Sequence, residues 1–138
     1  MMKFWQIILG IAAFSFAVGA SETQTFRDSA GRITGTVTIS GNQATYRDPQ
    51  GRLTMTSTTS GNTTTFRDSQ GRLIRTQTVS GNSSTYRDAQ GRTVGTATRS
   101  GSTTTYRDAQ GRMTGTATKS SSGTTYRDAQ GLNRGTKR

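Results

Sequence analysis

The stretch Tyr46-Arg47-Asp48-Pro49-Gln50-Gly51-Arg52 decides the fold, because its pattern returns every twenty residues without an insertion. A glycine follows each aspartate after three positions, and an arginine follows five of the six glycines. A fixed period of this length indicates tandem structural repeats that bury their faces against neighbouring units. The six aromatic-Arg-Asp copies begin at Phe26, Tyr46, Phe66, Tyr86, Tyr106 and Tyr126.

The composition excludes a chain built around one large core. The 138 residues allow a single domain, but only eleven Leu, Ile, Val or Phe residues follow position 20. This fraction is far below the roughly one fifth that is typical of a chain with a buried core. The chain also has no His and no Cys, which removes the usual metal and thiol chemistry. We therefore expect no deep pocket, no enzyme activity and no cofactor.

The first twenty residues have the three parts of a secretory signal peptide. Lys3 precedes an apolar run over residues 7–18, and small residues lead up to Ala20. The run is shorter than the ~20 residues of a spanning helix, so cleavage after Ala20 is expected. The sequence predicts a signal peptide at 1–20 and a six-unit β-repeat domain at 21–138. The mature protein is expected to be secreted or periplasmic, without a transmembrane span.

Within one unit the residue pattern predicts two short strands and two tight turns. Residues 33–39 alternate Thr with mostly apolar residues, as in a half-buried strand. Gly41-Asn42 suits a two-residue type II′ turn into a second strand at 43–47. In Asp48-Pro49-Gln50-Gly51 the aspartate caps the turn, the proline fixes φ, and the glycine takes the left-handed position.

Pairing arithmetic extends these hairpins into a continuous sheet. The Gly41-Asn42 turn sets Val37 opposite Tyr46, and a four-residue Asp loop sets Tyr46 opposite Leu53. A three-residue loop with a glycine bulge would exchange the two faces unless a second bulge restored them. We therefore expect six tandem 20-residue β-hairpins in a coiled antiparallel ribbon, whose open ends permit edge-to-edge self-association. The alternative is a two-sheet parallel β-solenoid with one unit per coil.

The repeat resembles a known family of hairpin repeats. The run Asp48 to Leu53, with Gly-x-Thr-Thr-x-Tyr before it in later units, is similar to the rearrangement-hotspot (YD) repeat, and the similarity covers residues 21–138. That family places Tyr directly before Asp, whereas Arg47 separates them here. A weaker similarity exists to MORN-type hairpin repeats. The resemblance implies a bacterial surface or secreted protein that contacts carbohydrate, although six units are too few for the toxin-enclosing shells of large members.

The Tyr-Arg-Asp trio is not expected to be catalytic. It occurs six times in equivalent settings, whereas an active site is normally a single cleft with perturbed pKa values. Calcium binding is also not expected, because one aspartate beside two arginines offers too few oxygen ligands. The motif is better explained by an aspartate that caps the turn and an arginine that pairs with it.

The arginines beside the Asp turns form a candidate binding edge. Without the first twenty residues the chain carries 17 basic and 7 acidic side chains, and a regular cationic edge with interleaved Tyr suits a polyanion. Acidic glycan or lipopolysaccharide is the expected partner, and export argues against chromosomal nucleic acid. The alternative is that charge protects an open sheet edge from aggregation. The candidate residues are Arg47, Arg52, Arg67, Arg72, Arg87, Arg92, Arg107 and Arg112.

A Thr-x-Thr ladder suggests a second function, ice binding. In a parallel solenoid such ranks would repeat every ~4.8 Å, whereas Thr is also an ordinary solvent-facing strand residue. Strand direction distinguishes these interpretations, because only parallel coils favour an ice-binding face. The ladder comprises Thr36, Thr38, Thr56, Thr58, Thr76, Thr78, Thr96, Thr98, Thr116 and Thr118. The leading hypothesis is a non-enzymatic binding or structural protein of the cell envelope.

Overall fold

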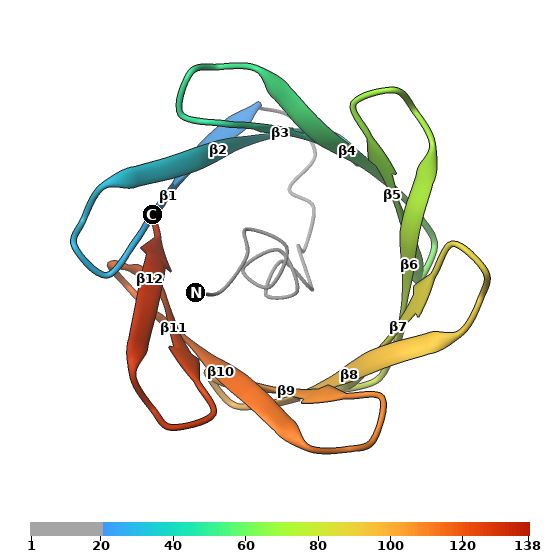
Figure 1. Ribbon diagram of the computed structural model, residues 1–138, viewed down its shortest axis with the longest axis vertical. Helices are drawn as coiled ribbons and strands as arrows, with labels where there is room; N and C mark the ends of the chain where they lie inside the picture. Colours follow the sequence, from blue (N-terminus) through green and yellow to red (C-terminus); the bar gives the residue numbers. More distant parts are fainter. Residues whose placement is uncertain (1–20) are drawn as a thin grey trace.

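The computed structural model describes residues 21–138, which form twelve antiparallel strands closed into one barrel (Figure 1). The expected all-β, β-hairpin character is confirmed, whereas the expected signal peptide lies outside the described residues. The strands are β1 (Glu22–Arg27), β2 (Ile33–Ser40), β3 (Gln43–Arg47), β4 (Leu53–Ser60), β5 (Thr63–Asp68), β6 (Leu73–Ser80), β7 (Ser83–Asp88), β8 (Thr93–Ser100), β9 (Thr103–Asp108), β10 (Met113–Ser120), β11 (Gly123–Asp128) and β12 (Asn133–Lys137).

The barrel closes because β12 pairs with β1 in the register that the repeat itself dictates. Phe26 lies opposite Lys137, just as Tyr46 lies opposite Val37 within a hairpin. Strand β1 therefore lies beside β12 in the way that β3 lies beside β2. This corrects the expected open ribbon, whose two ends pair with each other instead. The parallel solenoid is wrong, because neighbouring strands run antiparallel throughout residues 21–138.

The Gly turns have the predicted register. Ser40 lies opposite Gln43 and Val37 opposite Tyr46, and Gly41 adopts a positive φ of 57°. Glycine reaches this region without the steric cost that a Cβ atom would impose. The period-two pattern therefore predicted this half of each repeat correctly.

The Asp turns differ from the prediction by a pair of compensating irregularities. The Asp48 amide donates to the Arg52 carbonyl oxygen at 2.9 Å, which leaves a three-residue loop that ends at Gly51 with φ of 81°. Tyr46 then pairs with Met55 rather than with Leu53, because a β-bulge at Thr54 adds one residue. The bulge restores the faces that the odd loop length would have exchanged.

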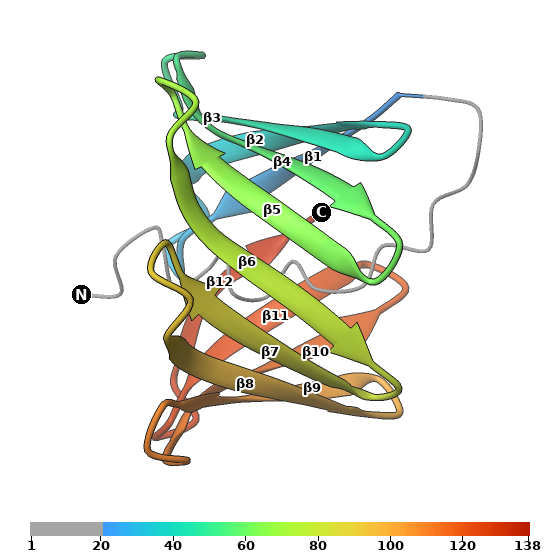
Figure 2. The same cartoon turned by 90° about the vertical axis from the view of Figure 1, so that its right-hand side faces the viewer.

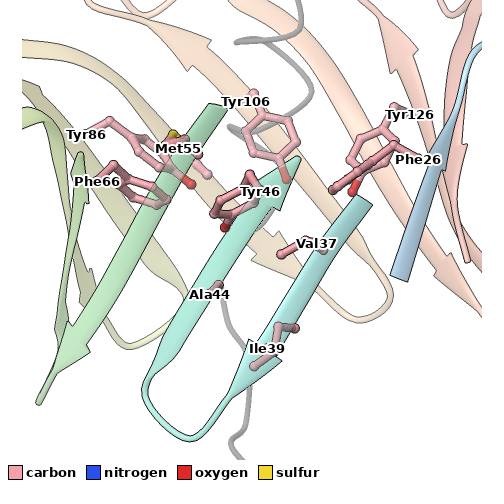
Figure 3. Close-up of a cluster of buried hydrophobic side chains, with 12 residues drawn as sticks. Phe26, Val37, Ile39, Ala44, Tyr46, Met55, Phe66, Tyr86, Tyr106 and Tyr126 are labelled. Carbon is pink, nitrogen blue, oxygen red and sulfur yellow. The ribbon is translucent and has the colours of Figure 1, made fainter. Parts of the chain in front are cut away.

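One hydrophobic cluster lines the inside of the barrel (Figure 3). Each unit contributes an aromatic ring at the same position, and a fully buried ring stabilises a fold by roughly 1.5–3 kcal/mol. In four of the units, three of them with Tyr, the strand partner of the ring is a glycine, as in the pairs Phe26–Gly35 and Tyr86–Gly95. Large rings opposite small residues explain how a chain so poor in aliphatic residues fills an interior. The cluster comprises Phe26, Val37, Ile39, Ala44, Tyr46, Met55, Phe66, Tyr86, Ala97, Tyr106, Ala117 and Tyr126.

Polar side chains also enter the interior. The Gln77 side-chain amide donates to the Ser84 hydroxyl at 3.2 Å, and both residues are buried. Burial raises the pKa of Tyr46 to about 12, although a hydrogen bond with Ser57 opposes the shift. The inner face is therefore a mixed wall of aromatic rings and short polar groups.

The two ends of the barrel are chemically different. Antiparallel alternation places the six Asp turns together at one end and the Gly turns at the other, as Figure 2 shows at its left and right sides respectively. The Thr-rich outer wall lies between them.

Candidate functional site: the Asp-turn rim

We define the Asp-turn rim as the six Asp turns, at 28–32 and every twenty residues onward, with the arginines that flank them. Twelve of the seventeen basic side chains after residue 20 lie here, together with all six aspartates. The closed ring brings these turns to one end of the barrel (Figure 2). The rim therefore has an excess of positive charge arranged in a circle.

Each aspartate organises its turn with both carboxylate oxygens. Oδ1 of Asp48 accepts hydrogen bonds from the backbone amides of Gln50 and Arg52, each at 2.9 Å. Oδ2 accepts from Nε of Arg52 at 2.8 Å. The same ion pair recurs in the first five units at 2.7–2.9 Å. These contacts agree with the interpretation of the motif as a capped turn.

These hydrogen bonds keep the aspartates ionised. The Arg52 side chain, followed by its backbone amide, holds the pKa of Asp48 below its usual value of 3.8 despite some desolvation. At Asp88 desolvation is the largest single influence and raises the pKa, but the hydrogen bonds from Arg92 and Gln90 together outweigh it. At neutral pH each aspartate therefore offsets one arginine and leaves the second uncompensated.

The arginines that pair with aspartate remain open to a ligand. Their side chains are 76–81% exposed, because the contact uses Nε and leaves the outer end of the guanidinium in solvent. Aspartate thus fixes the direction of the group without covering it.

A second arginine series is anchored to the same turns. Nη1 of Arg47 donates to the carbonyl oxygen of Gly51 at 3.0 Å, and the equivalent bond occurs in all six units at 2.9–3.3 Å. These residues lie on the outer face of the wall, because the neighbouring Tyr46 faces inward. Both arginines of a unit are therefore held in place by the turn that they flank.

The last unit restores its ion pair with a residue that the sequence did not suggest. Leu132 occupies the position of the paired arginine, and Nε of Arg134 reaches Oδ2 of Asp128 at 2.7 Å instead. The sequence did not point to Arg134, because this residue lies two positions later in its repeat than the paired arginines of the other units. An arginine so soon after Leu132, which interrupts the arginine series, was the signal that could have identified it.

The structure brings the predicted arginines together but excludes the predicted tyrosines. All eight candidate arginines lie on the Asp-turn rim, where Arg27, Arg32, Arg127 and Arg134 complete the circle. The Tyr rings lie inside the barrel, with Tyr46 and Tyr86 each 1% exposed. The expectation of Tyr interleaved with Arg on an exposed edge is therefore wrong.

The Thr ladder forms a belt around the outer wall. Thr45 lies opposite Thr38 on one side and opposite Thr56 on the other, so the ranks continue from strand to strand. Because the wall is closed and antiparallel, the belt is convex and equivalent Thr residues lie two strands apart. Over the described residues it does not form the flat parallel array on which the ice-binding interpretation depended.

Comparisons with protein families and with curated proteins match nothing to this chain. The likeness to YD and MORN repeats therefore remains a resemblance of short motifs.

Between residues 21 and 138 no group of three or more His, Cys, Asp or Glu side chains gathers where it could hold a metal ion. The same residues form no helix that is long and apolar enough to cross a membrane.

Proposed function

We propose that this is a non-enzymatic binding protein of the cell envelope, secreted or periplasmic, whose Asp-turn rim holds an acidic glycan or lipopolysaccharide. The observation that supports the proposal most strongly is the closed circle of twelve arginines at one end of the barrel.

The chemistry of the rim suits multivalent anions. A guanidinium presents a planar fork of donors that matches carboxylate, sulfate and phosphate groups. Because turn carbonyls and aspartates already hold these side chains, binding an anion costs less side-chain entropy than it would on a loose surface. Six equivalent turns further allow one long ligand to be held at several points, which multiplies weak contacts.

Heparin is a suitable probe of this proposal. Binding to the mature chain is measured by calorimetry over a series of salt concentrations, since contacts with a polyanion weaken steeply as salt rises. The rim variant replaces Arg47, Arg67 and Arg87 with Gln, which removes three exposed charges but leaves the Asp-paired arginines. The control replaces Arg99, Lys119 and Arg138 with Gln, removing three charges away from the rim.

The rim variant is expected to bind heparin at least about tenfold more weakly, with a shallower dependence on salt. The control also has a lower net charge, but its heparin affinity is expected to stay within about twofold of the parent's. Absence of heparin binding by the parent at low salt, or an equal loss in both variants, would overturn the proposal.

A further inference from the structure

The exposed large hydrophobic side chains gather on the Asp-turn rim. Six such residues occur among the described residues, between 37% and 59% exposed, and each Asp turn contributes one. They are Ile33, Leu53, Leu73, Val94, Met113 and Leu132. The Gly turns at the opposite end and the Thr belt contribute none of this set.

These aliphatic side chains lie directly beside the rim arginines. Arg47 pairs with Leu53 across the strands, and Arg67 pairs with Leu73 in the same way. Because Tyr46 faces inward, both members of such a pair face outward. The outer edge of the rim therefore alternates guanidinium groups with exposed aliphatic groups.

The fold does not require an aliphatic residue at this position. In the fourth unit Thr93 pairs with Arg87 at the equivalent place, and the exposed large hydrophobic residue is the next one, Val94. In the sixth unit Asn133 pairs with Arg127, and the preceding Leu132 is exposed. Each unit thus presents one aliphatic group at the rim even where the exact position changes, which points to a role in binding rather than in folding.

We propose that the Asp-turn rim docks onto a lipid layer that carries anionic phospholipid headgroups. The inference rests on the proposed function and names the form of its anionic ligand. The arginines would contact headgroup phosphates, while the six aliphatic side chains enter the boundary between headgroups and acyl chains. Exposed apolar groups combined with a cationic surface are the general requirement for such interfacial binding.

Charge complementarity favours this occupant over the others. A second copy of the chain would bring two cationic rims together, and their charges would repel. A soluble acidic glycan would satisfy the arginines but leave the aliphatic groups in water. A lipid layer satisfies both, and the six turns share one end of the barrel, so they can meet one surface together (Figure 2).

The test compares vesicle binding with heparin binding in the same proteins. Co-sedimentation is measured with vesicles of equal parts phosphatidylglycerol and phosphatidylcholine, and with vesicles of phosphatidylcholine alone. A second variant, the aliphatic variant, carries Leu53→Thr, Leu73→Thr and Met113→Thr, which introduce the residue that Thr93 already supplies. Its Ser control carries Thr58→Ser, Thr98→Ser and Thr118→Ser on the outer wall. Circular dichroism verifies that both remain folded.

The parent is expected to bind the anionic vesicles and not the neutral ones. The aliphatic variant is expected to lose about tenfold or more in vesicle affinity, because the apolar contribution disappears, while its heparin affinity stays within about twofold. The Ser control is expected to bind like the parent. Unchanged vesicle binding by the aliphatic variant would overturn the inference, as would a parent that binds heparin but not anionic vesicles. A parent that binds neither would overturn the proposed function as well.

Discussion

A disulfide across the barrel seam would test closure directly. Thr25 on β1 and Arg138, directly after β12, face each other across the seam, and they exchange two backbone hydrogen bonds of 2.7 and 3.0 Å. In antiparallel sheets such pairs have Cα atoms about 5.5 Å apart, which lies within the range that a disulfide spans. The chain has no cysteine of its own, so Thr25→Cys with Arg138→Cys would introduce a single defined pair.

The expected stabilisation follows from the length of chain that the bond encloses. The two positions lie more than a hundred residues apart, and the chain-entropy model gives about 4.7 kcal/mol for a loop of 100 residues. We expect the oxidised variant to exceed its own reduced form by about 4–5 kcal/mol in the free energy of unfolding. Urea denaturation followed by circular dichroism measures this difference, with the reduced protein as the matched reference.

The closed barrel also predicts where a disulfide should not form. Thr25→Cys with Thr85→Cys places the thiols on β1 and β7, on opposite sides of the ring (Figure 1). In dilute solution this pair should remain reduced or link separate molecules, whereas the seam pair should oxidise within one chain. A seam pair that forms only dimers, or that adds no stability, would refute the closed barrel.

Further predictions concern titration and the core. Burial, followed by the nearby charge of Lys119, lowers the pKa of Lys137 from 10.5 to about 8, so the folded state disfavours its charged form. Stability should therefore rise from pH 8 to 10 by up to about 3 kcal/mol, and Lys137→Met should remove that rise in urea titrations. Because the pKa of Asp68 is held below 3.8, mainly by the Arg72 amide, its contribution is complete above that pH and lost below it. Asp68→Asn should flatten the acid limb of a stability profile. Tyr86→Ala should cost about 3–5 kcal/mol, and Tyr86→Phe much less, in the same denaturation assay.

The hairpins could be predicted from the sequence, whereas the closure of the strands into a barrel could not. Alternation over 33–39 and the Gly41-Asn42 turn are local signals, so the strands and the pairing of Val37 with Tyr46 could be predicted from them. The bulge at Thr54 carries no local mark, because a threonine there looks like any other strand residue. Closure depends on stagger and twist accumulated over all twelve strands, which no single repeat reveals.

The candidate site was predicted in part for a similar reason. The arginines recur at fixed positions in the repeat, so the twenty-residue period identified them as candidates. The turns bring them together at one end of the barrel. Tyr46 and Arg47 are adjacent in the sequence, but neighbouring strand residues face opposite sides of a sheet, and here one side is enclosed. The exposed aliphatic side chain at each Asp turn could not be predicted from the period, because it occupies different positions in different repeats, as Leu53, Val94 and Leu132 illustrate.

The most direct test of the Asp-turn rim as the binding surface uses the glycine amides of both barrel ends. In an NMR titration of the ¹⁵N-labelled protein with a heparin oligosaccharide, the two sets of turn glycines report on the two ends of the barrel in one experiment. The Asp-turn glycines are Gly31, Gly51, Gly71, Gly91, Gly111 and Gly131; the Gly-turn glycines are Gly41, Gly61, Gly81 and Gly101. We predict saturable shifts in the first set and none in the second. Equal shifts in both sets, or shifts confined to the second, would contradict the assignment.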